Sequence, residues 1–147
     1  MDSQPLVSIR HLNHYFGQGA LNKQILFDIS LEVLPGEIII MTGPSGSGKT
    51  TLLSLIGGLR SVQEGSLTIL GQELSGANER KLVAVRRHIG YIFQNHNLLQ
   101  FMTAAQNVQM SVELHEDIPP AAARTKAQAM LEAVGLGERL NYYPQNL

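Results

Sequence analysis

A glycine-rich stretch between residues 43 and 50 has the residue types and the spacing of a phosphate-binding loop, G-x-x-x-x-G-K-[ST]. It reads Gly43-Pro44-Ser45-Gly46-Ser47-Gly48-Lys49-Thr50, and Thr51 follows. To wrap a triphosphate tail, several backbone N–H groups must converge on the same oxygens, and only a loop rich in glycine turns tightly enough for that. We therefore predict that these residues bind the phosphates of a nucleotide.

Two side chains of the loop have chemical roles of their own. Lys49 would reach the β- and γ-phosphates, which makes it a candidate catalytic residue, and the Thr50 hydroxyl would ligate Mg²⁺. Residues 49–59 carry leucine and isoleucine at helical spacing. The loop is thus expected to lead into a helix N-terminus, where aligned peptide dipoles favour negative charge.

The residues before the loop predict a strand. Residues 37–42, Glu-Ile-Ile-Ile-Met-Thr, form a short apolar and β-branched run. Such a run is typical of a strand that is buried on both faces of a parallel sheet. Strand, glycine loop and helix in this order are the context in which the motif binds phosphate.

The composition sets limits on the class of protein. The chain has 147 residues, 44% hydrophobic, 16% charged, with a net charge of −1 and no cysteine. This length favours one domain, and the charge gives no electrostatic reason to expect a nucleic-acid partner. The N-terminal residues do not resemble a secretory signal, and the apolar runs are too short for a membrane span.

The residues that precede this strand have antiparallel character. Leu6 to Tyr15 reads as one strand, and Ile25 to Val33 alternates so that odd-numbered residues would share one face toward a core. A strand with one buried face is typical of an antiparallel sheet. The residues predicted on that face are Ile25, Phe27, Ile29, Leu31 and Val33.

The remaining elements alternate between strands and helices. Residues 67–70 and 89–93 read as strands, the second of which would deliver Gln94 at its carboxyl end. Asn78 can cap a helix over residues 79–87, and Thr103 with Gln106 has capping-box spacing for a helix to about residue 115. Pro119-Pro120 opens a last helix that Gly135 would stop, with inward residues Ala123, Ala127, Met130, Leu131 and Val134.

Taken together, these segments resemble the N-terminal part of the ATP-binding subunit of an ABC transporter. Residues 43–50 correspond to the family's Walker A loop, residues 89–99 to its Q-loop region, and residues 14–17, His-Tyr-Phe-Gly, to its A-loop. Met41 to Lys49, Val85-Arg86-Arg87 and residues 103–108 are similar to the group of lipoprotein-release and macrolide-export ATPases. Within that group the chain most resembles DevA-type subunits of cyanobacterial envelope glycolipid exporters.

The resemblance implies roles for residues outside the loop. Tyr15 would stack on adenine, the alternative being an aromatic residue packed in the small sheet. Gln94 would sense Mg²⁺ and the attacking water, the alternative being a glutamine that merely caps a loop. Asn97 to Phe101 would meet a membrane-spanning subunit, the alternative being burial in the chain's own core. Two ATP-binding subunits would sandwich two ATPs. The protein would then lie peripherally on the cytoplasmic face of the membrane.

The fold expected from the resemblance is α/β, with the parallel-sheet core of P-loop NTPases (RecA-like). We expect one truncated nucleotide-binding domain over residues 1–147. About 1–35 would form an antiparallel β part, 36–95 the phosphate-loop core, and 96–147 the start of a helical subdomain.

The family's Leu-Ser-Gly-Gly-Gln signature, its Walker B strand and its switch histidine have no counterpart here. The aspartates of the chain are Asp2, Asp28 and Asp117, and none of them closes an apolar strand after the loop. Because phosphoryl transfer needs the metal and the water positioned as well, we expect these residues alone not to hydrolyse ATP efficiently.

Other functions remain open at this point. A small P-loop kinase usually opens with its phosphate loop, whereas this chain places strands before it. A GTPase should carry Asn-Lys-x-Asp, and Asn22-Lys23-Gln24-Ile25 lacks the aspartate. The chain could also act as a nucleotide-gated binding module without hydrolysis. A DNA-repair ATPase of the same superfamily finds little support in a nearly neutral chain.

Overall fold

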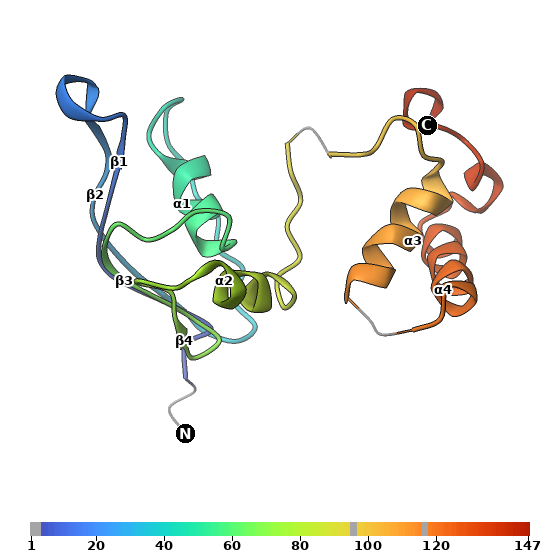
Figure 1. Ribbon diagram of the computed structural model, residues 1–147, viewed down its shortest axis with the longest axis horizontal. Coiled ribbons are helices and arrows are strands. Elements are labelled where there is room, and N and C mark those ends of the chain that lie inside the picture. The colour runs from blue at the N-terminus through green and yellow to red at the C-terminus, as the bar shows by residue number, and fades with distance from the viewer. Residues whose placement is uncertain (1–3, 95–96, 116–117) are drawn as a thin grey trace. The chain divides into compact units, whose positions relative to one another are not determined.

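The computed structural model describes residues 4–94, 97–115 and 118–147 (Figure 1). The chain forms two compact units, Met1–Tyr91 and Ile92–Leu147, which are described separately below. Asn95 and His96, which belong to the expected Q-loop region, lie outside the described residues. None of the helices in the described ranges has both the length and the hydrophobicity that spanning a lipid bilayer requires.

The first unit is built on a four-stranded antiparallel sheet with the order β2-β1-β3-β4. Its strands are β1 (Val7–Phe16), β2 (Lys23–Val33), β3 (Glu64–Ile69) and β4 (Gln72–Glu73), and a short 3₁₀ turn (Gly19–Leu21) joins the first two. The antiparallel character that the sequence predicts for the first 35 residues is confirmed. The strand near residue 67, however, pairs with β1 in this same sheet.

The predicted inward face of β2 is wrong for part of the strand. Leu26 is buried, whereas Phe27 is 63% exposed. The register of β2 against β1 shifts near Asp28, which has a φ of 49°. An extra residue in one strand moves every later side chain to the opposite face, so one alternating pattern cannot describe the buried face on both sides of this bulge. Ile29 and Leu31, on the other side of the bulge, are packed against the core as predicted.

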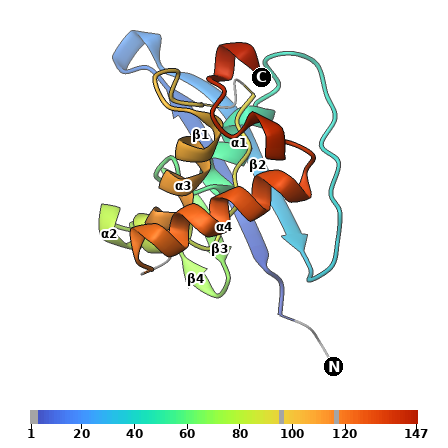
Figure 2. The same cartoon turned by 90° about the vertical axis from the view of Figure 1, so that its right-hand side faces the viewer.

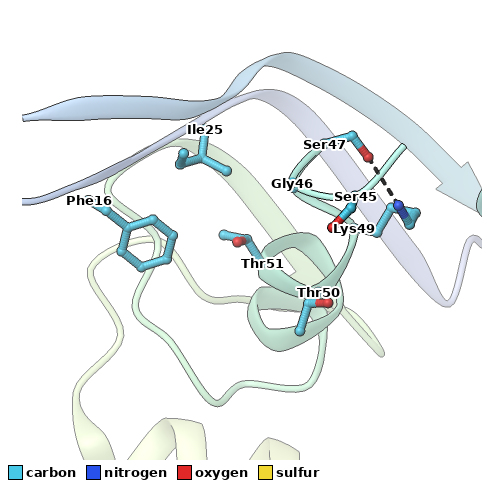
Figure 3. Close-up of a pocket in the computed structure, with 9 residues that line it drawn as sticks. Phe16, Ile25, Ser45, Gly46, Ser47, Lys49, Thr50 and Thr51 are labelled. Atoms are coloured by element: carbon cyan, nitrogen blue, oxygen red, sulfur yellow. Dashed lines mark hydrogen bonds between the residues drawn. The ribbon is translucent and has the colours of Figure 1, made fainter. Parts of the chain in front are cut away.

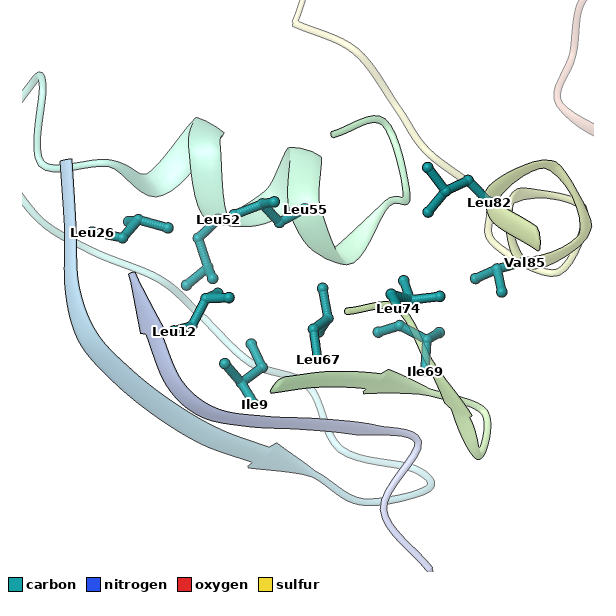
Figure 4. Packing of buried hydrophobic residues seen from close by; sticks show 10 residues of the cluster. All are labelled: Ile9, Leu12, Leu26, Leu52, Leu55, Leu67, Ile69, Leu74, Leu82 and Val85. Atoms are coloured by element: carbon teal, nitrogen blue, oxygen red, sulfur yellow. The ribbon is translucent and has the colours of Figure 1, made fainter. Parts of the chain in front are cut away.

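One helix covers the inner face of the sheet and creates the core (Figure 4). Helix α1 (Lys49–Ile56) buries Leu52 and Leu55 against residues of β1, β2 and β3. Helix α2 (Glu79–Arg86) adds Leu82 and Val85 to the same cluster. The predicted cap of α2 is confirmed, since the Lys81 backbone N–H donates to Asn78 Oδ1 over 3.0 Å.

The strands predicted for residues 37–42 and 89–93 are not present. Both segments lack strand pairing in the structure, and Ile38 and Ile40 are 90% and 82% exposed. A strand needs a hydrogen-bonded neighbouring strand on at least one side, and within the described ranges neither segment belongs to the sheet. The apolar pattern of these segments is that of buried strands, but the parallel sheet that it predicts is not formed by the described residues. A largely apolar groove of about 480 Å³ lies between β2 and residues 39–44.

The second unit is helical (Figure 2). Helices α3 (Ala104–His115) and α4 (Pro120–Ala133) pack side by side, and 3₁₀ turns follow at Gly137–Arg139 and Pro144–Asn146. The predicted capping box is confirmed, because the Thr103 N–H donates to Gln106 Oε1 and the Gln106 N–H donates to Thr103 Oγ1.

The predicted inward face of α4 is too wide. Ala123, Ala127 and Leu131 are buried, but Met130 and Val134 are 45% and 69% exposed. The buried residues recur every four positions and form a narrow stripe, which is all that a single neighbouring helix can cover. Val134 already lies beyond the last helical residue.

Candidate phosphate-binding site

The three glycines of the loop have the backbone conformations for which glycine is needed. Gly43, Gly46 and Gly48 have φ angles of 153°, 80° and 89°, a region that residues with a Cβ rarely adopt. Gly48 is also closely packed, because a Cβ there would lie 2.7 Å from Leu26 Cδ2 and 3.1 Å from the Ile25 carbonyl oxygen. The G-x-x-x-x-G-K spacing therefore sets both the turn of the loop and its distance from β2.

The loop ends at an open helix N-terminus. Gly48 is the N-cap of α1, and it has no side chain with which to accept a hydrogen bond from the first turn. The first N–H groups of a helix have no partner within the helix, and they carry partial positive charge. Residues 48–51 line a cavity next to this end. An anion in that cavity would meet both the loop and the helix dipole.

Lys49 folds its side chain back over the loop. Its Nζ atom donates to the carbonyl oxygens of Gly43 and Pro44, over 2.7 and 2.8 Å, and to Ser47 Oγ over 3.2 Å. All three partners are neutral oxygens, and none of the carboxylates in the described ranges forms an ion pair with this ammonium group. The loop therefore holds a positive charge that an anion can still neutralise.

The cavity has a polar end and an apolar end (Figure 3). Its volume is about 410 Å³, and the residues that line it are Phe16, Ile25, Ser45, Gly46, Ser47, Gly48, Lys49, Thr50 and Thr51. Phe16 comes from the end of β1 and Ile25 from β2, whereas the remaining residues belong to the loop and α1. A molecule with an anionic tail and a flat apolar head would fit this division.

The structure places Phe16, and not Tyr15, on the wall of the cavity. The Tyr15 hydroxyl donates to Glu64 Oε2 over 3.3 Å, and its backbone N–H donates to Gln63 Oε1. Desolvation and the nearby Glu64 carboxylate raise the pKa of Tyr15. Adjacent residues of a strand point to opposite faces, so only one of the two aromatic rings can face the loop. Sequence reasoning missed Phe16 because the register of β1 shifts on both sides of His14.

The other predicted site residues belong to the second unit. Gln94 is exposed there, and its role toward Mg²⁺ stays a prediction. In the segment Asn97 to Phe101, Leu98 and Phe101 are 41% and 75% exposed. Buried Asn107 fixes this segment, since its Oδ1 accepts from the Leu99 N–H over 2.8 Å and its Nδ2 donates to the Met102 carbonyl oxygen. The sequence carries no signal that singles out Asn107, because its burial is a property of the folded chain.

The site consists of the glycine loop, the uncapped N-terminus of α1 and the Lys49 ammonium group. Together these features are typical of a phosphate-loop domain that binds nucleotides. Comparison with known families agrees with this class. The family model described as "ABC transporter" matches residues 26–147. The chain therefore belongs to the ABC transporter family.

Relatives of known name support the same group within the family. The chain is 40% identical to the lipoprotein-releasing system ATP-binding protein LolD of Pseudomonas syringae, over all of this chain and 65% of that protein. It is 36% identical to the macrolide export ATP-binding/permease protein MacB of Marinobacter nauticus, over all of this chain and 23% of that protein. The chain thus spans less than two thirds of these relatives.

A solved structure confirms the fold class. The dimeric ATP-binding cassette MJ0796 bound to ADP and Pi superimposes with a TM-score of 0.87 at 28% identity, covering 96% of this chain and 62% of that one. The α/β class with an antiparallel β part is therefore that of ABC ATPase cassettes.

Replacing Gly48 tests the packing of the loop against β2. A Gly46→Ala variant meets no atom within 4 Å and carries backbone strain alone, which should cost about 1–2 kcal/mol of the free energy of unfolding. In a Gly48→Ala variant the clash with Leu26 and Ile25 should add about 1–3 kcal/mol. Denaturant unfolding of both variants measures the difference, and equal losses would contradict the close contact.

Proposed function

We propose that this chain is the ATP-binding part of an ABC transporter subunit. The observation that carries the proposal is the Lys49 ammonium group, which is held by three neutral oxygens over a cavity at the open end of α1. A triphosphate would exchange these weak neutral partners for charge-assisted hydrogen bonds, which are roughly twice as strong. The cavity that residues 45–51 line at the N-terminus of α1 supports ATP as the ligand.

The chemistry that Mg²⁺ supplies when bound is neutralisation of the phosphate charge. The Thr50 hydroxyl, at the first turn of α1 and on the cavity wall, is the side chain that we assign to holding it. Gln94 is the second residue proposed for this purpose. In the longer protein we propose that ATP is hydrolysed.

We assign binding, and not efficient turnover, to residues 1–147. Phosphoryl transfer needs a positioned water and a second set of metal ligands besides the phosphate cradle. The relatives extend beyond the matched region, since the chain spans 65% of LolD and 62% of the MJ0796 chain. We propose that the remaining parts of a longer subunit supply these groups, as well as strands that pair with residues 37–42.

For the base of the nucleotide we propose Phe16 as the stacking ring, in place of Tyr15. Phe16 and Ile25 form the apolar end of the cavity whose other end is the phosphate loop. An aromatic ring offers a base a flat apolar surface, and such stacking is worth about 1–3 kcal/mol per base. Tyr15, whose hydroxyl bonds to Glu64, does not line the cavity formed by the described residues.

The proposed partners are a second ATP-binding subunit and a membrane-spanning subunit. Solved cassettes of MJ0796 are dimeric, which supports the first. Exposed Leu98 and Phe101, in a segment held by Asn107, support docking of a membrane subunit on residues 97–101. The subunit would then lie at the cytoplasmic face of the membrane. The names of LolD and MacB favour export of lipid-like or envelope material as the function.

The alternative function is a nucleotide-binding module that responds to ATP without hydrolysing it. The described residues carry the groups for binding, so this alternative shares the site and differs only in turnover. A small P-loop kinase is disfavoured by the match of residues 26–147 to the ABC transporter family.

Removing the Lys49 ammonium group should weaken ATP binding. Because hydrogen bonds to charged groups contribute about 1.5–3 kcal/mol, a Lys49→Ala variant should bind ATP about 10- to 150-fold more weakly. Isothermal titration calorimetry measures the affinity. A Lys81→Ala variant loses the same charge from α2, away from the cavity lining, and should change affinity less than about two-fold. Equal ATP affinities of the two variants would contradict the assignment of the phosphate site to the loop.

Replacing each aromatic residue in turn decides which ring meets the base. A Phe16→Ala variant should bind ATP about 5- to 150-fold more weakly and leave pyrophosphate binding unchanged, because pyrophosphate has no base to stack. A Tyr15→Ala variant should bind both ligands as the unmodified chain does. A selective loss of ATP affinity in the Tyr15 variant instead would restore the role first predicted for Tyr15.

A further inference from the structure

Phe16 contacts a cation that lies outside the cavity lining. The Arg60 guanidinium carbon is 4.8 Å from the centroid of the Phe16 ring, within the range of a cation–π interaction. Arg60 is not among the described residues that line the cavity, whereas Phe16 is. The ring therefore lines the cavity and also contacts a guanidinium group that does not line it.

A second aromatic side chain packs against the same ring. His14 and Phe16 have ring centroids 5.1 Å apart and an interplanar angle of 81°, an edge-to-face pair. His14 is 4% exposed, and burial, followed by the charge of Arg60, lowers its pKa. The lowered pKa disfavours a charged imidazolium beside the guanidinium group. Phe16 is thus fixed by two neighbours of compatible charge.

The chain reaches Arg60 through a short turn that is itself anchored. After α1 ends, Gly58 adopts a φ of 64°, and its carbonyl oxygen accepts from Arg86 Nη1 over 2.8 Å. The Leu59 N–H donates to the Ser54 carbonyl oxygen, which ties the turn back to the helix. Helix α1 begins at the phosphate loop, and the turn that follows its C-terminal end places the Arg60 guanidinium group against Phe16.

We propose that Arg60 is a positioning residue for the nucleotide base. Its contact holds the Phe16 ring in place at the cavity wall, where the base would stack on it. A ring that is already ordered loses less freedom when the ligand stacks on it, so the contact should strengthen binding of the base and not of the phosphates. This inference rests on the proposed nucleotide-binding function.

The test compares ATP with pyrophosphate in variants of the full 147-residue chain. An Arg60→Met variant keeps a long flexible stem without charge, and it should bind ATP about two- to five-fold more weakly with pyrophosphate affinity unchanged. An Arg60→Lys variant keeps a cation and should retain most of the ATP affinity. An Arg80→Met variant, which removes an exposed arginine from α2, should bind both ligands normally.

Four outcomes would overturn the inference. Equal weakening of ATP and pyrophosphate in Arg60→Met would mean that Arg60 acts only through its charge on the anionic tail. Unchanged ATP affinity would mean that the Phe16 ring needs no support. Increased ATP affinity would mean that Arg60 competes with the base for the ring. If the unmodified chain binds neither ligand, the proposed function fails and the inference with it, whereas the other three outcomes overturn the inference alone. Thermal unfolding by circular dichroism verifies that each variant is folded.

Discussion

The close approach of Gly48 to β2 is the constraint on which the site depends. At this point α1 must begin with its first N–H groups open to the cavity while Leu52 and Leu55 are buried against the sheet. Only a residue without a Cβ fits between the loop and Leu26 in the left-handed conformation found there. The hydrophobic core and the phosphate cradle are therefore positioned by the same contact.

Because one contact positions both the core and the loop, residues of β1 and β2 contribute to the site as well as residues of the loop. Packing of α1 on the sheet brings Ile25 and the end of β1 to the edge of the loop, so that an apolar wall with Phe16 faces a polar cradle. Phe16 of this wall also contacts His14 and Arg60. In the proposed function, affinity for the tail and affinity for the base would arise from separate groups on one scaffold.

Local signals in the sequence predicted local structure well. The loop, the cap by Asn78 and the capping box of Thr103 with Gln106 all depend on residues within a few positions of one another, and the structure has each of them. Helix α4 was located for the same reason, although its buried stripe is narrower than predicted because only one helix covers it.

Features that depend on distant partners were not predictable in the same way. The bulge at Asp28 reverses the buried face of β2, and no pattern within β2 reveals the extra residue. Residues 37–42 have a strand-like pattern but find no neighbour among the described residues to pair with. The choice between Tyr15 and Phe16 likewise required the register of β1 against its neighbours. Which side chains of a strand are buried depends on the assembled sheet, whereas helix caps and turns depend on residues that are close in the sequence.

We propose that main-chain amides of the loop and the first turn of α1 bind the phosphate tail. Binding can be followed by titrating the isotope-labelled chain with pyrophosphate and recording ¹⁵N–¹H correlation NMR spectra. We expect saturable shifts for the amides of residues 45–51, with those of α4 unchanged. Saturable binding that leaves residues 45–51 unshifted would contradict this proposal.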